Sequence, residues 1–599
     1  MHRIHLPSNL ASTLAITLSL ALAGTTSAQQ AADTVAPESP AATTTASDNM
    51  AIAAALKAKA DGQPVTAQDW MIAAANPLAA EAGAKILARG GSAADAMIAV
   101  QTVLGLVEPQ SSGLGGGAFL VYWDNARKRL TTLDGRETAP LRATPTLFLD
   151  DQGEPLKFYD AVVGGLSVGT PGTPALMERA YKYWGTLPWP DLFQDAITLA
   201  TEGFDVSPRL AGLVAEDTDH LSHFPATAAY FLPDGEPIQA GDTLTNLPYA
   251  LTLRLLSANG SRAFYTGKMA DQIVQTVQTA PGNPGVLSQA DLALYQVVER
   301  PAVCGPYRVY EVCGMGPPSS GALTVAQILG MLDTYDLGAM GADDPQAWRL
   351  IGDASRLAFA DRGRYMADSD YVPVPVKGLL SPDYLARRAE LLEADTALKT
   401  IAPGEPEFDH AMLWADDQSI EFPSTSHISI VDSAGNVLSV TTTIENGFGS
   451  RLMVGGFLLN NELTDFSFRT HSDGHPIANR VEPGKRPRSS MAPTIVMKDG
   501  APVLAVGSPG GSRIIGYVAQ TVIAWADWGM NIQQAIALPH AVNRFGTYDV
   551  ETDAQVEGLT ALGYEVEQKA LNSGIHAIEI GEVLKGGADP RREGIALGE

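Results

Sequence analysis

Basic residues are scarce in this sequence. Lysine and arginine number 40 against 67 aspartates and glutamates, so the net charge is −27 and the isoelectric point is near 4.7. Because nucleic-acid binding requires a basic surface, this balance argues against a nucleic-acid partner. It does not argue against a small-molecule ligand, whose site can be locally basic. Hydrophobic residues make up 45% and charged residues 18%, as is typical of a globular protein.

Cysteine is almost absent. The two cysteines, Cys304 and Cys313, flank an alternating strand pattern at 307–312 and have no metal-site spacing with histidine. In an exported protein they could form a disulfide, but two reduced, buried thiols remain an alternative, because spacing alone does not place their Cα atoms. The sequence therefore predicts no metal site, and the chemistry discussed below needs no organic cofactor.

Long apolar runs are also lacking. The run from Leu10 to Ala23 contains four hydroxyl residues and is too short to span a bilayer comfortably. Weakly basic residues precede it, and small residues follow at 26–28, so we expect residues 1–28 to be a secretory signal. A retained anchor is the alternative. Residues 29–50 are rich in Ala, Thr, Ser and Pro and predict a disordered linker. A periplasmic or secreted protein without stable membrane insertion is expected.

The patterns along the chain change in kind. Strand patterns lie near the start, residues 160–400 are mostly helical, and strands dominate again from 425 until a helix beginning near Gly511. The 599 residues are ample for a large core, and no repeat of solenoid period is visible. We expect an α+β protein with a helix-covered, two-layered sheet, in which both ends of the chain contribute strands to one body.

One stretch of this strand-rich region organises the interpretation. A small polar loop, Ser424 to Ser426, runs into an apolar strand that ends at Asp432. A turn containing Gly435 and a second strand at 437–444 follow, which predicts a hairpin. Thr425 would stand at the start of the first strand. By itself a threonine there is ordinary, since threonine is favoured in strands.

Motifs downstream of Thr425 change that interpretation. They are Val440-Thr441-Thr442-Thr443, Asn460-Asn461-Glu462 with Asp465, Arg486-Pro487-Arg488-Ser489-Ser490-Met491, and Gly507-Ser508-Pro509-Gly510-Gly511-Ser512-Arg513. With Thr425-Ser426-His427, they resemble the γ-glutamyltransferase (glutathione hydrolase) family of N-terminal nucleophile hydrolases. The resemblance extends over roughly residues 65 to 595.

The resemblance implies a precursor that cuts itself between Ser424 and Thr425. It implies a four-layer αββα sandwich formed jointly by a large fragment, 51–424, and a small fragment, 425–599, which remain together as a heterodimer. Physically, a threonine hydroxyl is a weak nucleophile unless a base lies beside it. The cut frees the α-amine of Thr425, whose ordinary pKa is about 7.7–8.0. One residue then carries both the nucleophile and the base.

The resemblance also assigns the other reacting groups. Thr443 matches a residue whose hydroxyl bonds the nucleophile, although a threonine in a strand needs no such role. Gly510 and Gly511 match the oxyanion hole, where backbone N–H groups can approach the tetrahedral oxygen because no Cβ intrudes. A tight turn before a helix is compatible with that role.

Binding of a γ-glutamyl group, as in glutathione, needs sites for an α-carboxylate and an α-ammonium. Arg136, Ser489 and Ser490 match the carboxylate site, where an Arg fork suits a planar anion. A surface ion pair between Arg136 and Glu137 is the alternative. Glu462 and Asp465 match the ammonium site. Three residues apart, they converge only if the chain bends there; otherwise they are ordinary turn carboxylates.

Two departures from the family pattern affect specificity. Glu445 stands where many members have Asn and would add negative charge near the ammonium. The stretch between Asp465 and Ser489 contains no Tyr, whereas many members have a longer lid there with a Tyr that closes the pocket. A shorter lid predicts a more open site that admits bulkier γ-glutamyl or glutaryl compounds.

Two other functions compete with γ-glutamyl transfer. A glutaryl (cephalosporin) acylase shares the fold and the hydroxyl nucleophile, but a glutaryl group has no ammonium for Glu462 and Asp465 to bind. An uncleaved protein that only binds γ-glutamyl peptides is disfavoured by the complete nucleophile and oxyanion set. The resemblance therefore favours an exported enzyme that transfers γ-glutamyl groups from glutathione to water, amino acids or peptides through an ester on Thr425.

Overall fold

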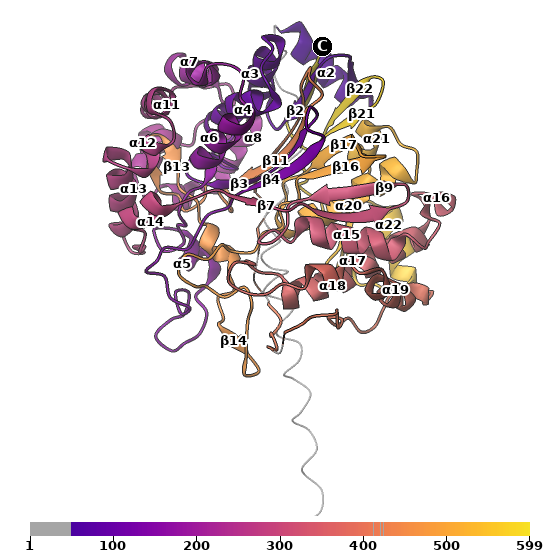
Figure 1. Ribbon diagram of the computed structural model, residues 1–599. Helices are drawn as coiled ribbons and strands as arrows, with labels where there is room; N and C mark the ends of the chain where they lie inside the picture. Colours follow the sequence, from indigo (N-terminus) through magenta and orange to yellow (C-terminus); the bar gives the residue numbers. More distant parts are fainter. Residues whose placement is uncertain (1–48, 411, 418, 420, 423) are drawn as a thin grey trace, which may run out of the picture.

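Two seven-stranded antiparallel sheets form the centre of the protein (Figure 1). The computed structural model describes residues 49–410, 412–417, 419, 421–422 and 424–599. The first sheet has the order β1 (Val65–Ala67), β22 (Leu584–Ala588), β21 (His576–Ile580), β17 (Ala501–Gly507), β16 (Thr494–Lys498), β9 (Tyr310–Gly314) and β8 (Val303–Tyr307). The second has the order β23 (Ile595–Gly598), β2 (Met71–Ala74), β10 (Ser426–Val431), β11 (Val437–Thr443), β3 (Gly117–Asp124), β4 (Arg129–Gly135) and β7 (Val298–Arg300).

Helices cover the outer face of each sheet (Figure 1). The second sheet shares its core with α2 (Met50–Ala60), α3 (Pro77–Ala88), α4 (Ala93–Val107), α6 (Thr173–Trp184), η1 (Trp189–Phe193), α7 (Gln194–Glu202), α8 (Pro208–Glu216), α9 (Thr218–Leu221), α10 (Pro225–Phe231), α11 (Leu247–Asn259), α12 (Arg262–Tyr265), α13 (Lys268–Gln278) and α14 (Gln289–Leu294). The first sheet shares its core with α15 (Gly321–Leu332), α16 (Leu337–Met340), α17 (Pro345–Tyr365), α19 (Pro382–Glu390), η3 (Leu391–Glu393), α20 (Ile514–Ala526), α21 (Ile532–Ala537) and α22 (Asp553–Ala561).

Short elements complete the fold. They are the helices α5 (Phe158–Val162) and α18 (Val376–Leu379), the 3₁₀ turns η2 (Pro233–Gly235), η4 (Glu462–Asp465) and η5 (Gly511–Arg513), and the strands β5 (Phe204–Asp205), β6 (Thr243–Leu244), β12 (Met453–Val454), β13 (Phe457–Leu458), β14 (His471–Ser472), β15 (His475–Pro476), β18 (Ala541–Asn543), β19 (Tyr548–Val550) and β20 (Val566–Gln568). The helix expected near Gly511 therefore starts with a 3₁₀ turn and continues as α20.

Alternation along β2 shows why the sheets stack. Ile72 and Ala74 pack against helices, whereas Met71 and Ala73 face the other sheet. Successive strand residues point to opposite faces, so a strand that is apolar on both faces needs a cover on each side. The outcome is one layer of helices, two sheets and a second layer of helices. The expected αββα sandwich is confirmed.

The segments before and after Thr425 alternate within both sheets. In the second sheet, β10 lies between β2 and β11, and β11 pairs with β3. In the first sheet, β16 pairs with β9, and β22 pairs with β1. Because these ladders join strands from both sides of residue 425, cutting the chain there would leave the two pieces bound by backbone hydrogen bonds and by their shared core.

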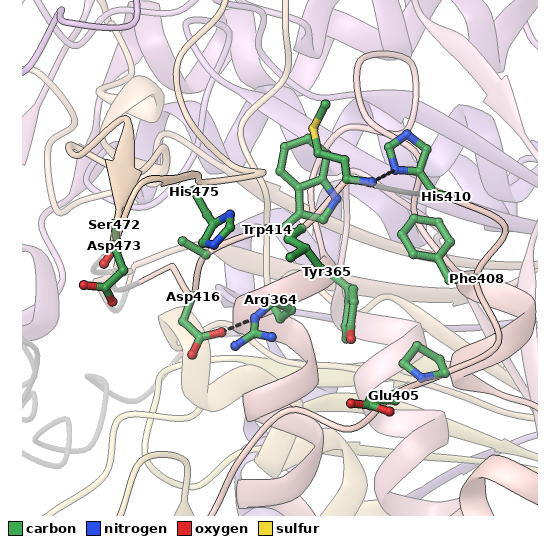
Figure 2. A pocket seen from close by; sticks show the side chains of 14 residues that line it. Arg364, Tyr365, Glu405, Phe408, His410, Trp414, Asp416, Ser472, Asp473 and His475 are labelled. Carbon is green, nitrogen blue, oxygen red and sulfur yellow. Dashed lines mark hydrogen bonds and ion pairs between the residues drawn. The ribbon is translucent and has the colours of Figure 1, made fainter.

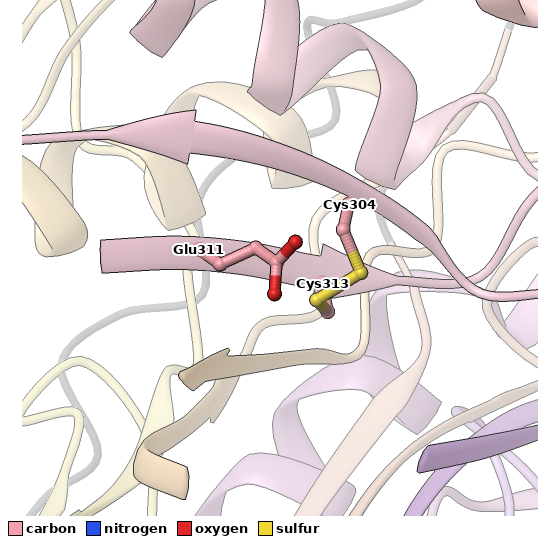
Figure 3. Close-up of side chains that lie close together, drawn as sticks. All are labelled: Cys304, Glu311 and Cys313. Carbon is pink, nitrogen blue, oxygen red and sulfur yellow. A yellow bond between two sulfur atoms is a disulfide. The ribbon is translucent and has the colours of Figure 1, made fainter. Parts of the chain in front are cut away.

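Cys304 and Cys313 form a disulfide across the β8–β9 pair (Figure 3), with their Cα atoms 4.1 Å apart. This settles the alternative that the spacing left open. Glu311 lies beside the pair, but sulfurs joined in a disulfide are not thiolate ligands for a metal.

The N-terminal expectations are only partly described. Asn49 caps α2 by accepting the Ala51 N–H, and Met50 is the first helical residue. Asn49 and Met50, the last two residues of the linker expected over 29–50, therefore belong to the start of a helix, because a capping side chain fixes the helix start there. The rest of that stretch lies outside the described residues. The signal expected at 1–28 lies outside the described residues. Among the residues that are described, no helix combines the length and apolar character needed to cross a membrane.

Candidate functional site

Thr425 lies immediately before β10, at the entrance of the predicted hairpin. β10 and β11 pair with Ser426 opposite Thr442, so Thr443 at the end of β11 stands beside Thr425. The Thr425 backbone has a φ of +98°, a region that a β-branched residue rarely adopts. Such a conformation costs about 1–3 kcal/mol and persists only where the surroundings enforce it.

Hydrogen bonds hold the groups on both sides of the peptide bond between Ser424 and Thr425. The Thr425 hydroxyl donates to Thr443 Oγ1 at 3.1 Å, and Thr443 Oγ1 accepts the Glu445 N–H at 2.9 Å. The carbonyl oxygen of Ser424 accepts the Gly510 N–H at 3.3 Å. An N–H donor therefore already points at the oxygen on which negative charge would develop if Thr425 attacked Ser424.

Only glycine fits well in the turn that supplies this donor. Gly510 has a φ of +134° and Gly511 a φ of +58°, where side chains are disfavoured. A Cβ on Gly511 would come 2.7 Å from the Phe422 carbonyl oxygen. Gly510 caps η5, which continues directly into α20, so the donor lies at the positive end of a helical segment.

Arg136 is buried in an acidic cluster. It follows β4 and pairs with Glu462 through a short contact and with Asp465 at 2.5 Å, while Glu137 lies 4.0 Å away. Glu462 and Asp465 reach one guanidinium because they occupy opposite ends of the 3₁₀ turn η4, where residues three apart share a face. This bend answers the convergence question that the sequence left open. Arg136 is not in the surface ion pair considered as the alternative.

The carboxyls of this cluster ionise with difficulty. Burial and the charge of Glu462 raise the pKa of Glu445 to about 8. Burial likewise raises the pKa of Glu137, Glu462 and Asp465, although Arg136 opposes the shift. Glu445 also accepts hydrogen bonds from the Asn461 amide and from the Phe422 N–H at 3.3 Å. A cation arriving among these carboxyls would favour their charged forms.

Ser490 lies in a second, basic cluster. Its hydroxyl and the Arg362 guanidinium both contact the carboxylate of Glu421, and Arg362 donates to Ser490 Oγ at 2.8 Å. Arg488 approaches the same carboxylate at 3.5 Å. Although burial opposes ionisation, Arg362 and Arg488 hold the pKa of Glu421 below its usual value.

The two clusters and the nucleophile border one small cavity of about 20 Å³. Its lining comprises Arg136, Glu421, Phe422, Thr425, Thr443, Glu445, Glu462, Asp465, Ser489, Ser490, Met491, Gly511 and Ile514. The structure therefore brings the predicted residues together, with Ser424 and Gly510 joined just beside the cavity. The Ser489 hydroxyl accepts the Met491 N–H at 3.1 Å. The individual substrate contacts remain predictions.

Sequence reasoning missed several residues here. Glu421 and Phe422 line the cavity from the segment just before Thr425, and Arg362 and Arg488 contact the Glu421 carboxylate. Arg488 lay inside a recognised motif, but Glu421 stands in a stretch with no periodic pattern. Arg362 lies in α17, whose pattern predicts only a helix. Their proximity depends on long-range folding.

A larger cavity of about 470 Å³ lies outside this site (Figure 2). It is bordered by the end of α17, by residues within 405–410 and 412–416, and by the hairpin of β14 and β15. Arg364 pairs there with Asp416 at 2.6 Å, close to Trp414 and His475 (Figure 2). The hairpin belongs to the stretch expected to be a short lid, so the larger cavity lies between that stretch and the segment leading to Thr425.

A threonine hydroxyl at the start of a sandwich strand, next to a carbonyl that accepts a backbone N–H, is the arrangement expected of an N-terminal nucleophile hydrolase. A model of the Gamma-glutamyltranspeptidase family matches residues 79–599, so the chain belongs to this family. The chain is 38% identical over 548 residues to a glutathione hydrolase proenzyme of Bacillus subtilis strain 168, covering 89% of this chain and 92% of that protein. It is 37% identical over 552 residues to the glutathione hydrolase proenzyme of Escherichia coli strain K12, covering 88% and 91%.

Among solved structures, a cephalosporin acylase from Bacillus halodurans superposes with a TM-score of 0.79 at 27% identity, over 90% of this chain and 97% of that chain. These similarities confirm the family, the fold and the enzyme class expected from the sequence. They also keep an acylase as the nearest competing activity.

Proposed function

We propose that this chain is a γ-glutamyltransferase and glutathione hydrolase made as a precursor. It cuts its own Ser424–Thr425 bond. The freed Thr425 then transfers γ-glutamyl groups from glutathione and related donors to water, amino acids or peptides. No cofactor takes part in these steps.

In the precursor the Thr425 hydroxyl attacks the carbonyl carbon of Ser424. The negative charge forms on the Ser424 oxygen, which the Gly510 N–H stabilises. The C–N bond then breaks, the hydroxyl proton reaches the departing nitrogen, and an ester joins Ser424 to Thr425 Oγ1. Water hydrolyses the ester, leaving a carboxylate on Ser424 and a free amine and hydroxyl on Thr425.

The observation that carries this proposal is the hydrogen bond from the Gly510 N–H to the scissile carbonyl of Ser424, 3.3 Å long. It stands next to a threonine whose hydroxyl is oriented by Thr443 and whose backbone has a φ of +98°. Opening the bond would release that strained conformation. The Gly510 N–H also serves the later turnover, because the γ-carbonyl of a γ-glutamyl substrate would occupy the place that the Ser424 carbonyl leaves.

During turnover the α-amine of Thr425 takes the proton of its own hydroxyl, directly or through water, and the oxygen attacks the γ-carbonyl. The amine then gives the proton to the leaving nitrogen, and an ester forms on Thr425. Water or the amine of an acceptor attacks this ester and restores the free hydroxyl. The residue that carries both the hydroxyl and the amine, Thr425, borders the cavity.

The charge clusters support a γ-glutamyl donor. In the acidic cluster the carboxyls of Glu462 and Asp465 suit an ammonium. Arg136, which they hold, suits a carboxylate together with Ser489 and the basic cluster at Ser490. In the continuous chain that basic cluster holds the carboxylate of Glu421, four residues before Thr425. We infer that this side chain stands in for the donor's carboxylate and leaves with its segment after the cut.

Export and assembly complete the proposal. Residues 1–28 direct the chain to the periplasm or the exterior. After the cut, 51–424 and 425–599 remain together as a heterodimer, because strands from both alternate in the two sheets.

Denaturing electrophoresis combined with two substrates tests this function. We expect two bands, and faster turnover of a γ-glutamyl anilide than of a glutaryl anilide of the same leaving group. A single band from active protein would contradict self-cleavage. Two bands with faster glutaryl turnover would favour an acylase, the activity of the Bacillus halodurans neighbour.

A further inference from the structure

The carbonyl oxygen of Thr425 contacts a side chain that the steps above do not use. Arg592 Nη1 donates to this oxygen at 3.2 Å, and Nη2 donates to the carbonyl oxygen of Asn572 at 3.0 Å. The arginine is 1% exposed. A buried guanidinium therefore joins the backbone of the nucleophile to a separate loop near the end of the chain.

Arg592 is itself held in place. Lys59 of α2 donates to the carbonyl oxygen of Arg592 at 2.9 Å and to that of Gly594 at 2.7 Å. The stem of the side chain passes so close to Gly574 that a Cβ there would lie 2.7 Å from Arg592 Cδ. Because both backbone and stem are fixed, the guanidinium has little freedom to move away from Thr425.

Cutting the chain changes which contacts orient the nucleophile. Before the cut, Gly510 holds the Ser424 carbonyl, and the Ser424 hydroxyl donates to the Gln110 carbonyl at 3.0 Å. Both contacts belong to Ser424 and no longer restrain Thr425 once the peptide bond is broken. The contacts from Thr443 and Arg592 are made to Thr425 itself and remain.

We propose that Arg592 is a positioning residue for Thr425: by binding the carbonyl oxygen of the nucleophile's own backbone, it keeps the hydroxyl and the freed amine aimed at the reacting carbonyl. The inference rests on the proposed self-cleavage. It predicts that Arg592 affects the rate of the chemical step, while donor affinity, which the two charge clusters set, is unchanged.

The test compares Arg592→Met and Arg592→Lys with the unaltered protein. Loss of a charged hydrogen bond that orients the nucleophile should slow self-cleavage and lower kcat by about ten-fold or more, with KM within about two-fold. Lysine should restore part of the loss, because its ammonium can donate to one of the two carbonyls. Both rates are measured below the melting temperature of each variant, by electrophoresis over time and by γ-glutamyl anilide turnover.

Arg388→Met is the matched control. Arg388 is also a buried arginine of the described fold, and its guanidinium donates to the backbone carbonyls of Leu357 at 2.9 Å and Ala402 at 3.0 Å, away from Thr425. Its loss should lower the melting temperature while leaving the cleavage rate and kcat of the folded protein within about two-fold.

Failure of the inference can be told apart from failure of the proposed function. If Thr425→Ala still yields two chains, the self-cleavage itself is misassigned. If Thr425→Ala remains one chain while Arg592→Met cleaves and turns over at the unaltered rate, only the positioning role is overturned. Should Arg592→Met not fold, Arg592→Lys decides: a lowered kcat with unchanged KM supports the role, and an unaltered kcat contradicts it.

Discussion

The acidic cluster around Arg136 and the basic cluster around Ser490 border the same cavity. They differ in where their carboxylates lie in the chain relative to Thr425. Glu462 and Asp465, which hold Arg136, lie after Thr425 in the chain. Glu421, which Arg362 and Ser490 hold, lies before it. A cut at Thr425 therefore leaves the first cluster intact and places the anion of the second on a free chain end.

If the proposed cut takes place, this difference lets one chain serve first as a precursor and then as an enzyme. Buried arginines without an anion are costly, because the charge loses its hydration. While the chain is continuous, Glu421 supplies that anion to Arg362 and lines the cavity. Once Glu421 is on a free end, a donor's carboxylate can replace it, whereas the acidic cluster already suits the donor's ammonium.

The largest expected effect comes from removing the Thr425 hydroxyl, which the proposal requires for conversion of the precursor into the cleaved enzyme. Thr425→Ala should abolish self-cleavage and lower turnover by at least about 1,000-fold, because no other residue supplies the nucleophile and its amine. Electrophoresis and γ-glutamyl anilide turnover measure the two effects. Thr425→Ser should retain both activities at reduced rates. Two chains from Thr425→Ala would contradict this account of the two clusters, since the cut that frees the chain end carrying Glu421 would then not depend on the Thr425 hydroxyl.

A second change removes the charge stabilisation. Gly510→Ala places a Cβ 2.7 Å from Tyr517 Cε2 at a φ of +134°, so the N–H must shift away from the Ser424 oxygen. Loss of one such donor typically costs about 100-fold, and the first-order rate of self-cleavage should fall by about that factor.

Gly90→Ala is the control for backbone strain. Gly90 has a φ of +82° with nothing within 4 Å of the added Cβ. It should destabilise the protein slightly without slowing self-cleavage. Equal slowing by Gly90→Ala and Gly510→Ala would mean that strain, and not the lost donor, is responsible.

A pair of substitutions, one in each cluster, distinguishes the contributions of the two clusters to KM. Asp465→Asn removes a charge from the acidic cluster and should raise KM for γ-glutamyl donors about ten-fold in the matured protein. Glu421→Gln should leave the KM of the matured protein within about two-fold, because under the proposal Glu421 has left the site. A raised KM for Glu421→Gln would contradict the proposal that Glu421 leaves the site after the cut while Asp465 stays in it.

The smallest effect concerns pH. Burial raises the pKa of Glu445 to about 8 from an ordinary value of 4.5. Between these values the folded chain retains a proton that the unfolded chain has lost, so this group's contribution to stability falls as pH rises toward 8. In the uncut Thr425→Ala background, Glu445→Gln should raise the melting temperature at pH 9 by roughly 2 °C relative to its effect at pH 5. The same shift at both pH values would refute the raised pKa.

Much of the fold and the membership of the site followed from the sequence. The hairpin of β10 and β11 depends on local alternation and turn residues, and these are readable along the chain. The motifs placed Thr425, Gly510 and Arg136 in one site. What local pattern could not provide was the 3₁₀ turn that aims Glu462 and Asp465 at the same guanidinium.

Contacts between distant segments lay beyond the sequence argument. Glu421 meets Ser490 and Arg362, and Arg592 meets Thr425, because separate elements pack together in the sandwich. Side chains of this kind carry no periodic signal, and their partners are set by tertiary packing. The sequence left the Cys304–Cys313 disulfide undecided for the same reason, because residue spacing does not determine strand register.

The central claim is that Thr425 becomes the first residue of its own chain. Intact-mass spectrometry of the purified, active protein tests it most directly. The account predicts two chains, the smaller with the mass of residues 425–599 and a free threonine at its N-terminus. A single chain in which Ser424 and Thr425 are still joined, with full γ-glutamyl transfer activity, would contradict it.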